Sequence, residues 1–323
     1  METKTQSQPH PRYASFARDV LEGLTQSPKR LPSKYFYDEA GDRLFQEIMQ
    51  MPEYYLTDSE LEILETHKQS ILELVNGEPF DIIELGAGDG FKTKVLLQHF
   101  LEQQADFCYR PVDISSNVLH HLESDLKERW PDLPYQGLQG DYFHVLEEVN
   151  KKNGKKKIIL FLGATIGNLT RERARGFLKR IGVNMHREDL LLVGFDLKKD
   201  PQVILDAYND PAGITARFNL NLLSRINREL GGHFDLEAFK HWETYDPVSG
   251  ATKSFLLSTC RQEVRIDAID RSISFDAWEA INVELSQKYS LSEIETTAVS
   301  CGYEVIEHFF DSRHYFVDTL WQK

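Results

Sequence analysis

A short apolar run that leads directly into a glycine-rich turn constrains this chain more than any other feature. Residues 80–85, Phe-Asp-Ile-Ile-Glu-Leu, have the apolar content of a buried strand, and residues 86–90, Gly-Ala-Gly-Asp-Gly, follow without a break. A helical pattern with apolar residues from Val95 to Phe100 comes next. Glycines between a strand and a helix allow a tight turn and a close approach of a ligand to the backbone. The segment therefore predicts a strand–turn–helix unit of an open α/β sheet.

The same rhythm of strand and helix continues through the middle of the chain. Further strands are expected at residues 107–113, 135–138, 157–162 and 189–195, with helices at residues 118–126 and 171–182. Buried parallel strands separated by helices are typical of a doubly wound sheet.

The end of the chain returns to this sheet. Ser290 and Glu293 form a capping-box pattern, Gly302 would end the helix, and residues 303–310 and 315–321 would be the two strands of a hairpin. A parallel sheet closed by an antiparallel hairpin is a feature of class I methyltransferases. We therefore expect this Rossmann-like α/β fold, with a doubly wound sheet and a terminal antiparallel hairpin.

Two stretches break the rhythm and predict a second, smaller α+β subdomain. Residues 12–59 mix turn signals with aromatic residues, and residues 199–286 contain helical pieces and two β-like runs, at 252–264 and 272–275. The predicted Rossmann-like methyltransferase domain therefore comprises residues 60–198 and 287–323. The predicted substrate-binding subdomain comprises residues 12–59 and 199–286.

Composition excludes several partners. The net charge of −14 opposes binding to nucleic acid, and the one basic run, residues 151–157, is interpreted as a solvated loop. The sequence contains no stretch of about 18 apolar residues that would predict a membrane span, so no membrane partner is expected. Three scattered cysteines fit a reducing compartment. A cytoplasmic monomer is expected. No metal is expected, because the histidines lack the spacing of metal ligands.

Charge indicates the cofactor of the glycine turn. A Gly-x-Gly turn also opens dinucleotide-binding folds, but Glu84 and Asp89 would place carboxylates where a diphosphate needs bare N–H groups. The same carboxylates favour a cofactor with a sulfonium and an ammonium, which predicts S-adenosylmethionine bound at Gly86 and Gly88.

Acidic residues follow the next two strands at the matching places. Asp113 can accept hydrogen bonds from ribose hydroxyls, and Asp141 and Tyr142 lie where adenine is bound in this fold. Taken singly, the glycines could form an ordinary tight turn, and Asp113 could cap the helix that begins at Ser115 and Ser116.

Several segments together carry a more specific resemblance. Residues 35–38, 52–55, 162–170, 207–210 and 283–289 are similar to the histidine-specific Nα-methyltransferase family, which makes histidine betaine (hercynine) for ergothioneine biosynthesis. The resemblance extends from about residue 15 to residue 321.

This resemblance implies roles for individual residues. The implied cofactor contacts are Gly86, Lys92, Asp113, Asp141 and Tyr142, with Tyr37 and Phe45 closing over the methyl-transfer site. The implied contacts to the substrate, L-histidine, are Tyr54, Gly163, Thr165, Asn168, Tyr208, Glu284 and Ser286. Among them Asn168 and Tyr208 would hold the carboxylate, and Glu284 and Ser286 the imidazole. Tyr37 and Asn168 are the residues expected to act in catalysis.

The residues themselves support some of these roles. On a strand, Glu284 and Ser286 share one face, and a carboxylate with a hydroxyl can serve both imidazole nitrogens. The same pattern could be a half-buried strand with a solvated face, and Asn168 could be a neighbour of the helix cap at Thr170. The resemblance also implies an apolar residue against the imidazole, and Phe255 or a neighbour is the nearest match.

Other aromatic positions have an ordinary interpretation as well. Tyr54, Tyr208 and Phe218 could be core residues, which is the commoner place for aromatic side chains.

The expected reaction is methyl transfer from S-adenosylmethionine to the α-amino nitrogen of L-histidine, three times in succession. Two alternatives stay open: a methyltransferase of the same fold for another amino acid or small amine, and a protein that binds the cofactor without catalysis.

Overall fold

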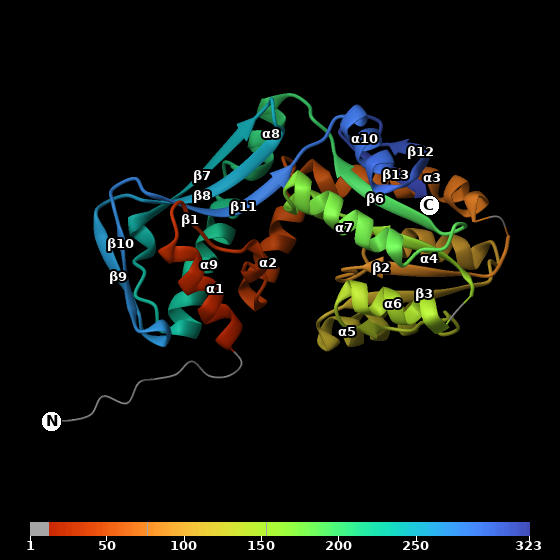
Figure 1. Ribbon diagram of the computed structural model, residues 1–323, viewed down its shortest axis with the longest axis horizontal. Helices are drawn as coiled ribbons and strands as arrows, with labels where there is room; N and C mark the ends of the chain where they lie inside the picture. The colour runs from red at the N-terminus through yellow and green to blue at the C-terminus, as the bar shows by residue number, and fades with distance from the viewer. Residues whose placement is uncertain (1–12, 76, 153) are drawn as a thin grey trace. The chain divides into compact units, whose positions relative to one another are not determined.

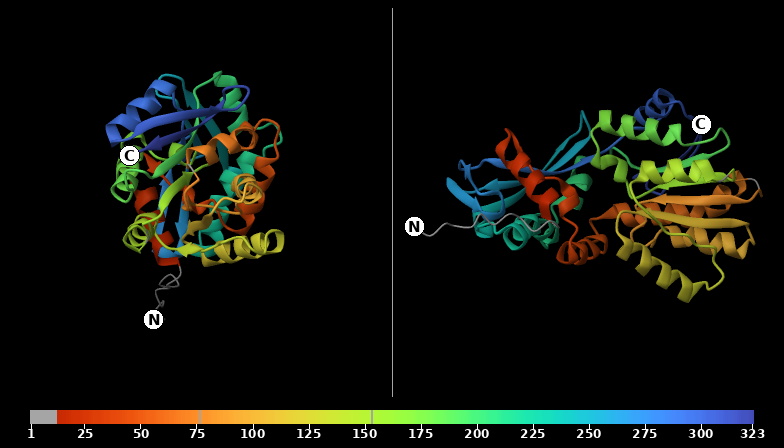
Figure 2. Two further views of the ribbon diagram at one scale, coloured as in Figure 1. Left: turned by 90° about the vertical axis from the view of Figure 1, so that its right-hand side faces the viewer. Right: turned by 60° about the horizontal axis from the view of Figure 1, so that its bottom comes forward.

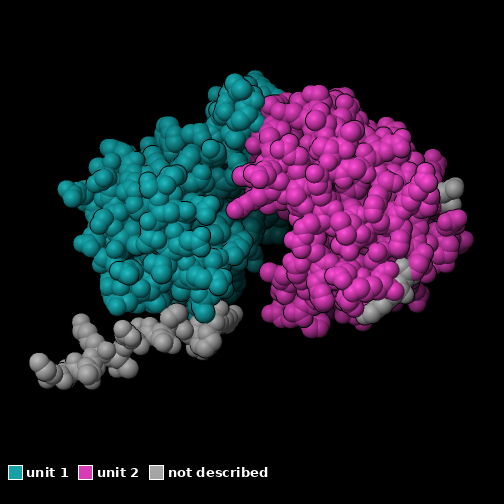
Figure 3. All heavy atoms as spheres, viewed as in Figure 1, with its two compact units in different colours: residues 1–55, 199–286 teal, residues 56–198, 287–323 magenta. Residues whose placement is uncertain are grey.

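The computed structural model describes residues 13–75, 77–152 and 154–323, and these form two compact units (Figure 3). Among the described residues, unit 1 comprises residues 13–55 and 199–286, and unit 2 comprises residues 56–198 and 287–323. The first boundary predicted from the sequence, after residue 59, falls inside a helix that begins at Tyr55. Its start of the subdomain at residue 12 lies outside the described residues.

A seven-stranded sheet forms the centre of unit 2, in the order β12-β13-β6-β5-β2-β3-β4 (Figure 1). The strands are β2 (Phe80–Leu85), β3 (Phe107–Asp113), β4 (Leu138–Gln139), β5 (Lys156–Phe161), β6 (Leu190–Asp196), β12 (Glu304–Phe310) and β13 (Phe316–Gln322). Neighbouring strands from β4 to β6 run parallel, whereas β13 is antiparallel to both β6 and β12. The doubly wound sheet with a terminal antiparallel hairpin is therefore confirmed.

Helices cover both faces of this sheet (Figure 2). They are α3 (Tyr55–Leu74), α4 (Thr93–Glu102), α5 (Ser116–Arg129), α6 (Tyr142–Lys152), α7 (Arg171–Val183) and α10 (Leu291–Cys301). Side chains of α6, α7 and α10 share one apolar core with Ile83 of β2. The next residue, Glu84, bonds to Thr93 of α4, and successive strand residues point to opposite faces. Every residue of β2 is buried as a result.

Local signals for the last helix are confirmed. Ser290 and Glu293 form the reciprocal capping box at the start of α10, and Gly302 ends the helix in the left-handed region, with φ +85°. Thr170 is the N-cap of α7 and accepts a hydrogen bond from the amide of Arg173, without the reciprocal bond of a capping box.

Three expectations about local structure are wrong in detail. The strand expected at 135–138 is reduced to β4 and an isolated bridge between Tyr135 and Tyr109, since it lies at the sheet edge and pairs on one side only. The run 252–264 is two strands, interrupted at residues 259–261. The basic run at 151–157 is not simply a solvated loop, because Lys157 begins the buried part of β5 and pairs with Asp189 at 2.7 Å; its Asn153 lies outside the described residues.

Unit 1 contains a four-stranded sheet in the order β1-β11-β8-β7 and a separate two-stranded hairpin. The sheet strands are β1 (Lys29–Arg30), β7 (Phe239–Asp246), β8 (Ala251–Ser258) and β11 (Ala280–Gln287), and the hairpin strands are β9 (Gln262–Ile266) and β10 (Arg271–Phe275). The helices are α1 (Ala14–Thr25), α2 (Glu39–Met49), α8 (Pro201–Tyr208) and α9 (Ile214–Leu230), with short 3-10 turns η2 (Ser33–Tyr35), η4 (Leu236–Ala238) and η5 (Asp267–Ile269).

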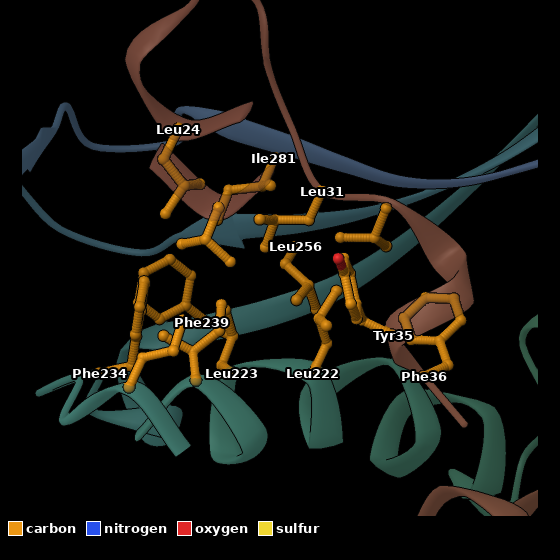
Figure 4. Close-up of a cluster of buried hydrophobic side chains, with 14 of the residues drawn as sticks. Leu24, Leu31, Tyr35, Phe36, Leu222, Leu223, Phe234, Phe239, Leu256 and Ile281 are labelled. Carbon is orange, nitrogen blue, oxygen red and sulfur yellow. The ribbon is translucent and has the colours of Figure 1, made fainter. Parts of the chain in front are cut away.

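The N-terminal arm of the chain belongs to the core of unit 1. Leu222 and Leu223 of α9 lie beneath Leu256 of β8, and Tyr35 and Phe36 of the arm pack into the same cluster (Figure 4). The Pro and aromatic density of the arm is explained by this packing. Helix α9 thus joins the first residues of the unit to its sheet.

No helix in the described part of the chain is long and apolar enough to cross a membrane.

Leu222→Ala should destabilise unit 1, because Leu222 is fully buried between α9 and the sheet and its loss leaves a cavity. We expect a cost of about 2–5 kcal/mol, measured by urea unfolding. Leu291→Ala is the matched control, since Leu291 is 38% exposed at the start of α10. Equal losses in the two variants would contradict the central place of α9.

Candidate active site

The glycine turn after β2 requires glycine for two different reasons. Gly86, Gly88 and Gly90 all have positive φ, at +76°, +56° and +63°. At Gly86 a side chain would also collide, because a Cβ there would lie 2.7 Å from the hydroxyl of Tyr142. At Gly88 a Cβ would meet nothing within 4 Å, so the space beside this glycine is open. The turn therefore presents bare backbone beside a tyrosine hydroxyl.

The residues expected to hold the cofactor after β3 and β4 lie close to this turn. Burial first, and then the charges of Asp113 and Asp141, raise the pKa of Tyr142 to about 12, which shows that these three side chains are neighbours. The amide of Gly140 donates to the carbonyl of Asp113 at 3.0 Å, which joins the ends of the two strands. The carboxyl ends of β2, β3 and β4 thus bring together a glycine turn, a tyrosine and two carboxylates.

Asp113 also has the structural role that the sequence left open. Its Oδ1 accepts from the amide of Ser115 at 2.8 Å, while Ser115 itself is the N-cap of α5. Burial raises the pKa of Asp113, and the amides of Ser115 and Ile114 oppose that rise. Because Oδ1 of Asp113 is bonded to the amide of Ser115, the hydrogen bond to the ribose that is expected of Asp113 would be made by Oδ2.

The carboxylates of Glu84 and Asp89 are used within the turn rather than left open to a ligand. Both oxygens of Glu84 accept hydrogen bonds from hydroxyls, one from Thr93 at 2.6 Å and one from Tyr109. Asp89 accepts from the amide of Phe91 at 3.0 Å. Glu84 is only 5% exposed, so the exposed carboxylate of Asp89 is the better placed of the two to attract a cationic cofactor.

Lys92 lies at the start of α4 and forms an ion pair with Glu60 of α3. Glu60 is fully buried and also accepts two hydrogen bonds from the amide of Gly163, at 2.7 and 2.9 Å. The side chain of Lys92 is 22% exposed, so it can still reach a ligand. Nothing in the sequence pattern of α3 singled out Glu60, because only the fold brings it to the strand ends.

The loop after β5 exposes three of the seven residues that the resemblance implies as substrate contacts. Gly163 and Ala164 both have positive φ, and the short turn η3 (Thr165–Asn168) follows. The hydroxyl of Thr165 donates to the carbonyl of Leu162 at 2.7 Å, which fixes the start of the turn. Gly163, Thr165 and Asn168 are all solvent-exposed, on unit 2.

The other predicted site residues lie in unit 1, where an aromatic series connects them. Tyr37 packs edge-on against Phe45 with ring centroids 5.6 Å apart, Phe45 against Tyr54 at 6.3 Å, and Tyr54 against Tyr208 at 6.3 Å. Phe218 of α9 contacts both Tyr37 and Phe45. Phe218 lies in the core of unit 1 and Phe45 and Tyr54 pack against it, whereas Tyr37 is about half exposed.

Tyr208 joins this series to polar groups on β11. Its hydroxyl lies 2.8 Å from the Oγ of Ser286, and its carbonyl lies 3.0 Å from Nε2 of the buried His241. Two residues along β11, Glu284 accepts a hydrogen bond from Ser254 of β8 at 2.9 Å. Glu284 and Ser286 are thus held by neighbours rather than facing solvent alone.

Tyr37 lies near the carboxylate of Glu284. Burial of the phenol, then the charges of Glu284 and Asp42, raise the pKa of Tyr37 above its ordinary value, although 48% of the residue is exposed. Tyr37 therefore stays protonated near neutral pH and cannot act as a phenolate base.

Phe255 is not the residue beside Glu284. Phe255 pairs with Trp242 across the sheet, and alternation along β8 places it on the face opposite Ser254, which contacts Glu284. The two neighbours of Phe255, Ser254 and Leu256, both lie on this opposite face, and the apolar residue against the imidazole stays a prediction. Ser254 and His241 are two residues that sequence reasoning missed.

The described residues contain no cluster of three or more His, Cys, Asp or Glu side chains that could hold a metal ion.

The strand order and the strand-end residues define a class I methyltransferase that uses S-adenosylmethionine. The residues fit this cofactor, because a Cβ at Gly86 would fill the space beside Tyr142 and carboxylates lie at the next two strand ends.

Comparison with known proteins narrows this class. A family model described as histidine-specific, SAM-dependent methyltransferase matches residues 16–323. A histidine N-alpha-methyltransferase of Mycobacterium tuberculosis is 34% identical over 93% of this chain and 92% of its own length. That of Mycolicibacterium smegmatis is 34% identical over 88% of each chain. An L-tryptophan methyltransferase of Psilocybe serbica is 28% identical over 92% of this chain and 88% of its own.

The chain therefore belongs to the family of histidine-specific, S-adenosylmethionine-dependent methyltransferases, and it is an N-methyltransferase.

Glu84→Gln should change how stability depends on pH. Burial raises the pKa of Glu84 from 4.5 to about 7, so the folded protein retains a proton that the unfolded chain releases. Relative to the Gln variant, the native protein should be most stable below about pH 4.5 and lose about 3 kcal/mol as the pH rises to about 7. Urea unfolding across this range measures the difference, with Glu128→Gln on the exposed face of α5 as control. A difference that does not vary with pH would contradict the raised pKa.

Proposed function

We propose that this protein transfers methyl groups from S-adenosylmethionine to the α-amino nitrogen of L-histidine, three times, to give histidine betaine. The observation that supports histidine as the substrate is the pair Glu284 and Ser286. Glu284 is hydrogen-bonded to Ser254, and Ser286 to Tyr208. Ionised Glu284 can accept an imidazole N–H, and the Ser286 hydroxyl can donate to or accept from the second nitrogen. Relatives that bear the name histidine N-alpha-methyltransferase support the same substrate.

The hydroxyls of Tyr208 and Ser286 act as one unit in this proposal. The two hydroxyl oxygens lie 2.8 Å apart, and either one can be the donor. If Ser286 donates to Tyr208, the tyrosine can donate to the substrate carboxylate. Asn168, which the resemblance assigns to the same carboxylate, supplies a neutral amide. Neutral donors of this kind discriminate against an amine without a carboxylate, because they would be left unpaired.

The cofactor supplies an activated methyl group on a positively charged sulfur. In each round the ammonium form of the substrate first loses one proton to solvent, and the neutral nitrogen then forms the new bond to that methyl carbon while the carbon–sulfur bond breaks. An in-line displacement of this kind needs alignment and a neutral amine more than a strong base. We assign to Tyr37 the positioning of the amine through its hydroxyl oxygen, which suits a phenol that stays protonated.

In unit 2 we propose that Gly86, Gly88, Asp113, Asp141 and Tyr142 hold the cofactor and that Lys92 binds its carboxylate. Gly163 and Thr165 keep the substrate contacts that the resemblance implies, and Phe45 and Tyr54 complete the apolar lining around Tyr37.

A second substrate class is favoured by one observation. A relative covered over 88% of its length bears the name L-tryptophan methyltransferase, so an indole side chain is accommodated within related proteins. The hydroxyl of Ser286 argues for imidazole, since imidazole has a second ring nitrogen for this hydroxyl and an indole has none.

Incubation of the protein with L-histidine and S-adenosylmethionine should give mono-, di- and trimethylhistidine in turn. Mass spectrometry measures these products over time. With tryptophan in the same assay, histidine should be consumed at least about tenfold faster, because the indole has no second ring nitrogen for the Ser286 hydroxyl. Turnover of tryptophan alone would overturn the substrate and leave the methyltransferase class intact. A product that stops at one methyl group would overturn the trimethylation.

Glu284→Ala should raise the KM for histidine and lower kcat/KM by about 100-fold, because the half-buried partner of the imidazole is lost. Binding of S-adenosylhomocysteine, measured by calorimetry, should be unchanged. Glu263→Ala is the control, since Glu263 is an exposed carboxylate on β9 of the same unit. Equal losses of histidine turnover and cofactor binding would show that Glu284 is structural.

A further inference from the structure

A second carboxyl group is buried next to the one that holds Lys92. Asp318 of β13 and Glu60 of α3 are both fully buried, at the carboxyl end of the parallel sheet in unit 2. Asp318 pairs across the sheet with Gly194 of β6. A Cβ at Gly194 would lie 2.3 Å from Oε1 of Glu60 and 3.0 Å from Oδ1 of Asp318. A glycine inside a strand often marks such a close approach, and here it makes room for two carboxyl groups.

Asp318 lacks the partners that a buried carboxylate requires. In the part of the chain that the structure describes, no N–H or hydroxyl donates to either of its oxygens. The charged groups that face it are Glu60 from α3 and Lys92 from the start of α4, whereas β6 contributes only the backbone of Gly194. Two carboxyl groups can bond to each other only if one of them retains a proton.

The proton belongs on Asp318. Glu60 already accepts hydrogen bonds from the amide of Gly163 and from Lys92, whereas no described residue donates to Asp318, so a hydrogen bond between the two carboxyl groups needs its proton on Asp318. Burial first, and then the charge of Glu60, raise the pKa of Asp318 well above its ordinary range, and the charge of Lys92 opposes them. A neutral Asp318 can donate a hydrogen bond to Glu60, and an ionised one would repel it.

We propose that Asp318 is a positioning residue of the cofactor site, whose proton bonds to Glu60 so that Glu60 holds Lys92 and the amide of Gly163 in place. The role of Lys92 rests on the proposed function, in which Lys92 binds the cofactor carboxylate. Glu60, Asp318 and the cofactor carboxylate would then surround the ammonium of Lys92. This arrangement is stable only if one of the three carboxyl groups is neutral.

Asp318→Asn and Asp318→Leu separate the proton from the hydrogen bond. Asn mimics the protonated carboxyl group and keeps a donor, whereas Leu has a similar volume and no donor. Asp318→Asn should bind S-adenosylhomocysteine within about twofold of the native protein by calorimetry, and Asp318→Leu should bind it about tenfold more weakly, the usual loss for one hydrogen bond to a charged group. Native affinity in the Leu variant would overturn the proposal.

The pH dependence of stability tests the proton independently. The unfolded chain releases the Asp318 proton above about pH 4, so the native protein should lose stability relative to Asp318→Asn as the pH rises. The difference in Tm should grow by about 5 °C or more between about pH 5 and about pH 8. Asp132→Asn, at an exposed position of the same unit, should show no such trend. A constant difference for Asp318→Asn would overturn the proposal, even if the Leu variant does not fold.

Lys92→Met distinguishes this proposal from the function on which it rests. Weakened binding of S-adenosylhomocysteine supports both. Unchanged binding would remove Lys92 from the cofactor site and overturn the positioning role of Asp318, whereas methylation of histidine would still be judged by product mass.

Discussion

The buried carboxylate of Glu84 is the constraint on which the site in unit 2 depends. Its two oxygens accept hydrogen bonds from Thr93 of α4 and Tyr109 of β3, so one side chain connects β2 to its neighbouring strand and to the helix that follows. Because the turn between β2 and α4 is held at both ends, Gly86 meets Tyr142 at a defined place. Burying a carboxyl group without such donors would cost several kcal/mol, which explains why the hydroxyls are there.

A second principle of this unit is that glycines make room for carboxyl groups. Gly163 donates its amide to Glu60, and Gly194 leaves the space that Glu60 and Asp318 occupy. Acidic groups therefore gather at the carboxyl ends of the strands, where a parallel sheet binds its ligands. Among the described residues, the cation that forms an ion pair with Glu60 is Lys92. This charge distribution suits a cofactor that carries a sulfonium and an ammonium.

Unit 1 uses a different design, in which aromatic packing supports a few polar groups. Phe218 on α9 contacts Tyr37, and the series of rings continues to Tyr208, whose hydroxyl meets Ser286. The polar residues of β11 are thereby held at fixed positions by a rigid apolar frame. Recognition by such groups is selective, because a substrate that fails to pair with them leaves a buried hydrogen-bonding atom unsatisfied.

The sequence by itself determined the doubly wound sheet, the closing hairpin and the glycine turn, because strand burial, helix caps and positive φ are set by nearby residues. It also placed Glu284 and Ser286 on one strand. Only the tertiary structure decided which side chains meet across elements distant in sequence. Glu60 lies on a helix with no motif, yet it reaches Gly163. Ser254 rather than Phe255 contacts Glu284, because strand pairing in unit 1 sets which face each residue occupies. Local pattern carries no information about such long-range contacts, and the buried pair of Glu60 and Asp318 exists only when the sheet is assembled.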